Sequence, residues 1–233
     1  MKFEVVDNKF QGKRCFILGS APSILEEDLS LLENEYVMTL NNSFQLTEYG
    51  LKKYQFYNVS DSKIYNSLYK KIKTEIPKDV IRFYPDGWFG KEKYNIPPVE
   101  DFISYTNSNL LSDEPISLSN NIMPESFYDG LGGEVSVITD SIMLCHFMGF
   151  KEIYLLGADL YKEPGKPTHF FGVRKRGKKH FSTNEKRLKI ILKNLSSMFK
   201  SKNKKFVNLS TNFKFIDCMD VGTLNNIISQ DFI

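Results

Sequence analysis

Short apolar runs alternate with amphipathic segments along most of the chain, and this alternation predicts the order of its secondary structure. The runs with the length and composition of buried strands cover residues 15–18, 36–40, 55–57, 80–84, 151–156 and 204–209. Segments with helical spacing lie between them, at 24–33, 62–75, 135–148 and 183–199. The pattern predicts an α/β fold, namely a Rossmann-like, mostly parallel open sheet with helices on both faces.

The stretch 85–129 interrupts this alternation. It is rich in Pro, Asn, Ser and aromatic residues and has little periodicity. A long irregular stretch inside a compact domain is typical of a lid or a binding insertion. We therefore expect a single Rossmann-like domain over residues 1–233 that carries an irregular lid insertion at 85–129. After residue 213 we expect a strand fragment and a short helix.

Composition narrows the class of protein. Charged residues make up 25% of the 233 residues, and the net charge of +3 is too small to argue for a nucleic-acid partner. The three cysteines lack metal-ligand spacing, and Cys15 and Cys145 lie in apolar runs, so buried free thiols in a reducing compartment are expected. The polar start of the chain and the lack of a long apolar run predict a cytoplasmic protein. Peripheral contact with the inner face of the membrane and a homo-oligomer both stay open.

Polar residues follow the predicted strands where the chain leaves them: Ser20, Asn41, Asn58, Asp159 and Ser210. Ligands of open parallel sheets bind outside the carboxyl ends of the strands, so we expect these residues to converge on one cleft. Asn both donates and accepts hydrogen bonds, which suits a base edge, a ribose or a phosphate. The alternative is that Asn and Ser only form turns here.

The loop at residues 19–23 (GSAPS) joins the first predicted strand to the predicted helix at 24–33. A strand, a loop of small residues and a helix N-terminus together direct backbone N–H groups and the helix dipole towards an anion. The loop lacks the Lys of a P-loop and the three-glycine dinucleotide fingerprint. A plain turn and a phosphate cradle therefore both stay open.

Two further segments suggest contact with an anion. Gly132 and Gly133 precede the long apolar segment at 135–148. Glycine at the start of a helix lets a ligand approach the backbone.

The second segment is a basic loop at 174–179, which ends at His180. It is either a solvated segment or part of a flexible flap, at 162–181, over a phosphate or an acidic acceptor. Neighbouring cations favour the neutral imidazole that a general base requires.

Four motifs carry a family resemblance: FILGSAPSI, LNNSF, FYNVSD and MGFKEIYLLGADLY. Together they resemble the bacterial sialyltransferases of glycosyltransferase family 42. They also resemble a broader group that includes the archaeal 6-hydroxymethylpterin diphosphokinases. The family's Arg-Ile-Thr-Ser-Gly segment is replaced here by residues 132–136, so the resemblance supports a nucleotide-sugar donor better than sialic acid itself.

The resemblance implies roles for individual residues. His180 matches the general base, Tyr161 would hydrogen-bond the departing phosphate, and His169 lies near a second phosphate-binding position. It also implies that Ser20 and Ala21 lie in the nucleotide loop and that Asn42, or its neighbour Asn41, and Asn58 contact the nucleotide. Together with the loops and strand ends above, the predicted nucleotide-binding set is Gly19, Ser20, Ala21, Pro22, Ser23, Asn41, Asn42, Asn58, Ser60, Gly132, Gly133, Asp159 and Ser210.

The leading hypothesis is a glycosyltransferase that needs no metal or other cofactor. It would transfer a sugar, sialic acid or a similar one, from a CMP-activated donor to a bacterial surface-glycan acceptor such as lipopolysaccharide or capsule. The first alternative is a diphosphokinase-like transfer from ATP to a small alcohol, with Mg²⁺ held by Asp61 and Asp159. The second alternative is a non-catalytic nucleotide-binding protein of a glycan pathway.

Overall fold

The computed structural model describes residues 1–85, 102–106, 118–132, 136–159, 167, 169–172, 179–210 and 217–229, without the side chains of residues 119 and 179–185. Its centre is one eight-stranded sheet in which every neighbouring pair is parallel, in the order β5-β4-β3-β2-β1-β6-β7-β8. The strands are β1 Arg14–Leu18, β2 Tyr36–Leu40, β3 Phe56–Asn58, β4 Ile81–Pro85, β5 Phe102–Tyr105, β6 Glu152–Leu156, β7 Lys205–Asn208 and β8 Asp220–Val221.

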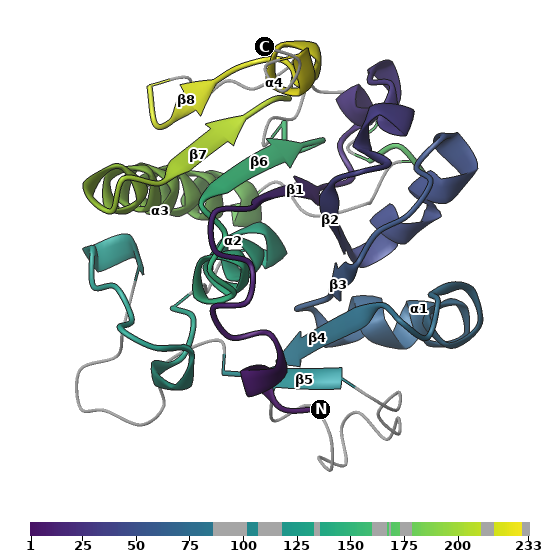
Figure 1. The fold of residues 1–233 in the computed structure, drawn as a ribbon, viewed down its shortest axis with the longest axis horizontal. Coiled ribbons are helices and arrows are strands. Elements are labelled where there is room, and N and C mark those ends of the chain that lie inside the picture. The colour runs from purple at the N-terminus through teal and green to yellow at the C-terminus, as the bar shows by residue number, and fades with distance from the viewer. Residues whose placement is uncertain are drawn as a thin grey trace.

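The order of the strands places a reversal in the middle of the sheet (Figure 1). The chain enters at β1 and adds β2 to β5 successively on one side. It then returns to the other side of β1 with β6 and continues outward through β7 to β8. The point where the direction reverses lies between β1 and β6, which is where open α/β sheets bind their ligands.

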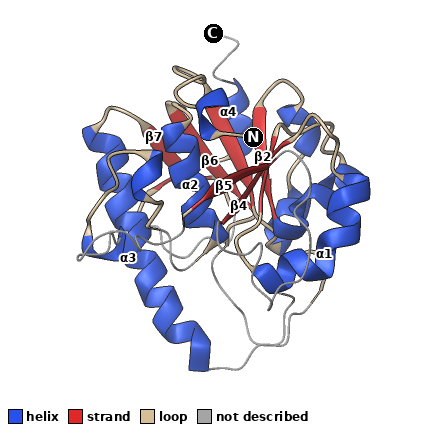
Figure 2. Ribbon diagram, turned by 90° about the horizontal axis from the view of Figure 1, so that it is seen from below, coloured by secondary structure: helices blue, strands red, loops and turns tan. Residues whose placement is uncertain are grey.

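Helices cover both faces of the sheet, as Figure 2 shows with helices in blue and strands in red. Helices α2 (Val137–Phe147) and α3 (Lys179–Ser201) pack on one face. The other face is covered by α1 (Ser62–Glu75), α4 (Leu224–Ser229) and the 3-10 segments η2 (Pro22–Glu26), η3 (Leu29–Leu32) and η4 (Asn41–Tyr49). Shorter 3-10 turns are η1 Phe3–Val5, η5 Leu118–Asn120 and η6 Phe127–Asp129. The predicted fold class is confirmed.

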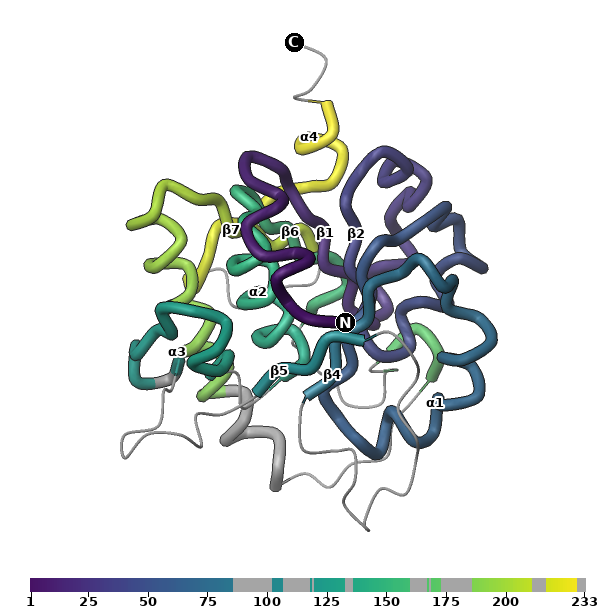
Figure 3. Tube along the Cα trace, turned by 60° about the horizontal axis from the view of Figure 1, so that its bottom comes forward, coloured from purple at the N-terminus to yellow at the C-terminus, as the bar shows by residue number. Residues whose placement is uncertain are grey.

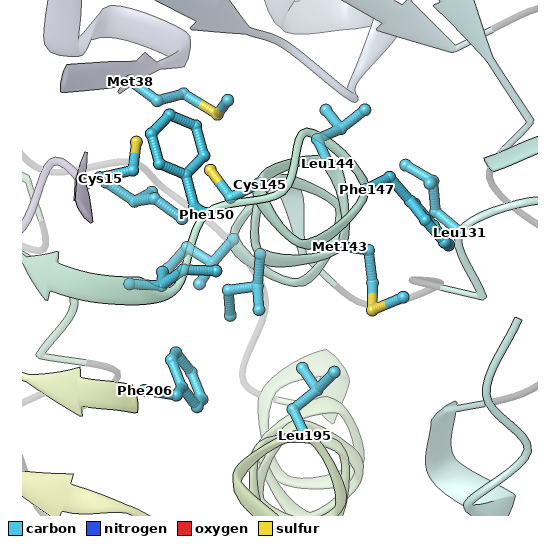
Figure 4. Close-up of a cluster of buried hydrophobic side chains, with 14 of the residues drawn as sticks. Cys15, Met38, Leu131, Met143, Leu144, Cys145, Phe147, Phe150, Leu195 and Phe206 are labelled. Carbon is cyan, nitrogen blue, oxygen red and sulfur yellow. The ribbon is translucent and has the colours of Figure 1, made fainter. Parts of the chain in front are cut away.

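Successive side chains of β1 point alternately into the two halves of the hydrophobic core. Cys15 and Ile17 pack towards α2 and α3, whereas Phe16 and Leu18 pack towards the α1 side. Figure 4 shows Cys15 close to Cys145 of α2. All three cysteines are free and buried, so the expectation of buried thiols is confirmed.

The structure corrects two predicted helices. The segment 24–33 forms two short 3-10 turns, η2 and η3, because Pro22 opens the first turn and Asp28 caps a second one. The loop at 19–23 therefore has no α-helix dipole behind it. Helix α3 begins at Lys179, ahead of the predicted start at residue 183. Within the predicted insertion at 85–129, residues 102–105 form β5, a short strand paired with β4.

Most of the remaining predictions of secondary structure hold. The strand at 36–40 and the helix at 62–75 have the predicted bounds. The tail has the expected strand fragment β8 and short helix α4. In the described part of the chain, no helix combines the length and hydrophobicity that crossing a membrane requires.

Candidate functional site

The carboxyl ends of β1 and β6 are joined directly through their backbones. Gly19 N donates to Leu156 O at 2.8 Å, and Ala21 N donates to Gly157 O at 2.9 Å. A Cβ on Gly19 would lie 2.3 Å from Gly157 O, and Gly157 has a φ of +59° that favours glycine. Glycine at both positions therefore allows the two loops to meet at the reversal point of the sheet.

Side chains reinforce this junction. Ser23 Oγ donates to Asp159 Oδ1, and Ser43 Oγ donates to Gly19 O at 2.6 Å. Burial raises the pKa of Asp159, and the hydrogen bond from Ser23 opposes the rise. The carboxyl of Asp159 thereby ties the end of β6 to the loop at 19–23.

The end of β7 joins the same edge of the sheet. Ser210 Oγ accepts from Ala158 N at 2.8 Å, and Asn208 Oδ1 accepts from Ser210 N at 2.8 Å. Ser210, predicted from sequence, thus supports the loop that carries Asp159.

His169 contacts the loop at 19–23 from a distant part of the sequence. Its Nδ1 lies 2.8 Å from Ser20 Oγ, and Phe170 N donates to Ser20 O at 2.8 Å. Where Nδ1 accepts from the serine hydroxyl, Nε2 carries the ring proton and is the atom able to donate to a phosphate. The structure therefore brings together Ser20 and His169, which the sequence assigned to one site.

Asn58 belongs to a fully buried polar cluster. Its Nδ2 donates to Ser141 Oγ at 2.8 Å, and its Oδ1 accepts from the Tyr105 hydroxyl at 3.0 Å. The same hydroxyl lies 3.4 Å from Asp140 Oδ2. The Asn58 side chain has no exposed surface, so in this structure it braces β3, β5 and α2 against each other and presents no face to solvent.

Asp140 is a fully buried carboxyl in that cluster. Burial raises its pKa well above the usual value, while hydrogen bonds with Tyr105 and Ser60 oppose the rise. Its Oδ1 is buried and has no hydrogen-bond partner in the described structure. A neutral Asp140 can donate to Tyr105, whose own proton then goes to Asn58. Ser60, predicted as a ligand contact, thus also contacts this buried cluster.

The Asn residues after β2 lie at the same edge of the sheet. Asn41 and Asn42 open η4 and are partly exposed. Asn41 has a φ of +52°, and its buried Oδ1 has no hydrogen-bond partner among the described residues. A buried acceptor atom without a donor next to the end of β2 is an unsatisfied hydrogen-bonding group at this edge of the sheet.

Several predicted residues have other positions or lie outside the described residues. Asp61 is the N-cap of α1, where its Oδ1 accepts from Lys63 N at 2.8 Å and Ile64 N at 3.2 Å. Gly132 lies just before α2, with a φ of +63°. Tyr161 and Gly133 lie outside the described residues, as does the side chain of His180, whose backbone is in the first turn of α3. No cluster of three or more His, Cys, Asp or Glu that could hold a metal occurs in the described ranges.

Sequence reasoning missed four residues of this edge: Ser43, Tyr105, Asp140 and Ser141. Asp140 could have been noticed in the sequence, since it is the one carboxylate in the largely apolar segment 137–147. Tyr105 carried none, because it stands in the irregular stretch and reaches Asn58 only through the pairing of β5 with β4.

A separate hollow lies at the opposite, amino edge of the sheet. Its volume is about 820 Å³, and its lining includes Lys13, Arg14, Glu35, Lys53 and Glu152. It touches none of the residues predicted from sequence. The Arg14 guanidinium is paired there with the Glu35 carboxylate at 2.5 Å.

Comparisons with known proteins agree with this architecture. Neither a protein-family model nor a curated protein sequence matches the chain. Among solved structures, it is similar to the MAf glycosyltransferase from Magnetospirillum magneticum AMB-1, with a TM-score of 0.58 and 15% identity. That likeness covers 95% of this chain and 35% of the other, so this chain spans about a third of that protein's length.

The second similar structure is the sialyltransferase CstII from Campylobacter jejuni in complex with a substrate analogue, cytidine-5'-monophosphate. The TM-score is 0.51 and the identity 15%, covering 91% of this chain and 85% of that one. Likeness at such identities concerns the backbone alone. The chain has a glycosyltransferase-like fold.

Proposed function

We propose that this protein is a glycosyltransferase that takes its sugar from a nucleotide-activated donor, with a CMP-sugar as the leading candidate. The observation that carries this proposal is the junction of the loops at 19–23 and 157–159 at the reversal point of the parallel sheet. That position is where α/β sheets of this kind bind nucleotides. The glycosyltransferase-like fold and the CMP complex of one similar structure support the same class.

The phosphate of the donor would lie against the loop at 19–23. With the Ser20 hydroxyl donating to His169 Nδ1, the Nε2–H of His169 is the hydrogen-bond donor left for the phosphate. Stabilising the charge that develops on the departing phosphate is the main requirement of such a transfer. Asn41 and Asn42 would bind the nucleoside, with the unpaired Oδ1 of Asn41 as one contact.

The acid–base roles come from the family resemblance. His180 would accept the proton of the attacking acceptor hydroxyl, and Tyr161 would hydrogen-bond the phosphate as it leaves. General-base assistance is typically worth about 10²–10⁴-fold in rate. In this scheme no metal takes part, and the acceptor is a bacterial surface glycan.

A thermal-shift screen tests the nucleotide class. CMP, CDP, ATP and GTP are added singly, with and without Mg²⁺, and the midpoint of unfolding is followed. A ligand at 100 times its Kd stabilises the folded protein by about 2.7 kcal/mol. Stabilisation by CMP without metal is the expected result. Stabilisation only by ATP with Mg²⁺ would instead support the diphosphokinase alternative.

A transfer assay then separates an enzyme from a nucleotide-binding protein without activity. We expect His180→Ala to lose about 10²–10⁴-fold in turnover of a CMP-sugar while CMP binding is kept. Lys186→Ala, an exposed position on the same helix, serves as the control. Near wild-type turnover in the His180 variant would show that another group is the base.

A further inference from the structure

The turn at residues 169–172 is fixed to the predicted phosphate loop at two points. His169 Nδ1 lies 2.8 Å from Ser20 Oγ, and Phe170 N donates to Ser20 O at 2.8 Å. The turn closes on itself where Gly172 N donates to His169 O at 3.0 Å. Because two atoms of one serine hold this turn, its rings have a defined position relative to the loop.

A row of aromatic rings leads from the loop outward. The rings of His169 and Phe171 are parallel, with an interplanar angle of 1° and centroids 5.0 Å apart. Phe171 meets Phe170 edge to face at 5.2 Å, and Phe170 meets Tyr49 edge to face at 5.6 Å. In Figure 3 the turn at residues 169–172 is drawn as a short green segment. It lies beside the blue coil of η4, which ends at Tyr49. We refer to these four residues as the aromatic ledge.

Two rings of the aromatic ledge are unusually exposed. Phe171 is 45% and Tyr49 48% accessible, while Phe170 between them is partly buried against the core. Among the described residues, the exposed large aromatic side chains are these two and Tyr128, which lies on η6. Two of the three therefore stand beside the predicted phosphate loop, although leaving large rings in water forgoes the free energy of burying them.

We propose that Phe171 and Tyr49 form a binding subsite for a sugar ring of the acceptor glycan. The faces of aromatic rings are electron-rich and attract the weakly positive C–H groups of a pyranose face. The exposed rings, each set edge to face against Phe170, also match the aromatic lining that is usual in ligand sites. The subsite rests on the proposed function, because that function is what makes the bound sugar an acceptor.

The position of the ledge favours a sugar over the nucleobase of the donor. The acceptor hydroxyl attacks the donor-sugar carbon that carries the departing phosphate, so the acceptor binds within reach of the phosphate site, and His169 begins the ledge at that site. The base and ribose are instead expected at the ends of β2 and β3, near Asn41 and Asn42. The nucleoside of the donor and the sugar of the acceptor would thus bind to separate surfaces.

Saturation-transfer NMR on the intact chain tests this subsite with defined probes. The probes are lactose and the methyl β-glycosides of galactose, glucose and N-acetylgalactosamine, with CMP added as an independent ligand. We expect Phe171→Ala to weaken binding of the glycosides by about 5- to 10-fold and to leave the Kd for CMP unchanged. Phe171→Trp, which keeps a ring, should retain binding. The control is Tyr128→Ala, which removes an exposed ring from the opposite face of the sheet and should alter neither ligand.

Other outcomes would refute the sugar subsite. They can be distinguished from outcomes that refute the proposed glycosyltransferase function. If Phe171→Ala weakens CMP and not the glycosides, the ledge is a base platform. If the wild type binds CMP but none of the glycosides, or binds them equally after Phe171→Ala, the subsite is wrong while the nucleotide site stands. If the glycosides bind through Phe171 and CMP does not bind, the sugar subsite is supported and the proposed CMP-sugar donor is refuted.

Discussion

Gly19 and Gly157 meet backbone to backbone where the sheet reverses direction, and neither position has room for a side chain. A Cβ on Gly19 would stand 2.3 Å from Gly157 O, which is a rigid backbone atom. The contact is the structural basis of the candidate site, because it holds the loops after β1 and β6 together.

The first prediction concerns this contact. Gly19→Ala should lower the free energy of unfolding by about 1–3 kcal/mol, since overpacking forces the two backbones apart. The comparison is Gly222→Ala, where the nearest atom is a flexible Leu209 methyl at 3.3 Å, and a change below about 1 kcal/mol is expected. Urea unfolding of both variants measures the difference. Equal losses at the two positions would contradict the steric account.

The second prediction compares two buried tyrosines. Tyr105→Phe removes the hydroxyl that donates to Asn58, and should cost about 1–3 kcal/mol because a buried acceptor loses its donor. The matched control is Tyr57→Phe, since the Tyr57 hydroxyl is buried without a hydrogen-bond partner in the described structure. Its removal should be neutral or slightly stabilising. Chemical denaturation measures both, and a costlier Tyr57→Phe would refute the assignment.

The third prediction follows from the buried carboxyl of Asp140, whose pKa burial raises. The folded protein binds this proton more tightly than the unfolded chain, so the stability that it contributes is present below the unfolded pKa and is lost as pH rises. The loss is at most about 1.4 kcal/mol per pH unit. Asp140→Asn should remove this dependence and be more stable than wild type at neutral pH. Parallel stability curves for the two proteins between pH 4 and 8 would count against a buried, proton-binding Asp140.

The fourth prediction concerns His146, whose titration makes stability fall, instead of rise, as the pH is lowered. Burial, with help from Lys204 and Lys202, lowers its pKa from 6.5 to about 3, and Lys204 Nζ lies 3.1 Å from His146 Nδ1. The unfolded chain therefore binds this proton first, and stability falls as pH drops from about 6.5 towards 3, by at most about 1.4 kcal/mol per unit. His146→Gln should be less sensitive to acid over that interval. Thermal melts at several pH values would show it, and an unchanged acid response would disprove it.

Local patterns predicted the sheet well because its strands are buried on both faces. The run at 36–40 and the stripe at 62–75 are uninterrupted, and both elements have the predicted bounds. The helix predicted at 24–33 was wrong, although Leu25, Leu29 and Leu32 have helical spacing. The segment forms two 3-10 turns, in which Leu29 and Leu32 are buried and Leu25 is 44% exposed. Strand β5 was missed since its short run gives little periodicity.

The candidate site was only partly predictable, for a related reason. Ser20, Asp159 and Ser210 each follow a strand, so chain order alone brings them to one edge. What they do there depends on partners distant in sequence. Ser20 meets His169, and Asn58 meets Tyr105 and Ser141, through pairings that no local window contains. Asn58 is fully buried among these contacts, where the resemblance implied a contact with the nucleotide.

The central position of β1 also bears on how the chain acquires its structure during synthesis. Strands β1 to β5 pair with neighbours that follow directly in sequence, so they can assemble as they leave the ribosome. The other edge of β1 remains open until β6 arrives, and Leu18 then pairs with Leu156. Closing so long a stretch of chain is slow, and an apolar edge strand left open invites pairing with other chains. We expect this edge to be the last to gain protection in pulsed hydrogen exchange, and the place where chaperones are most needed.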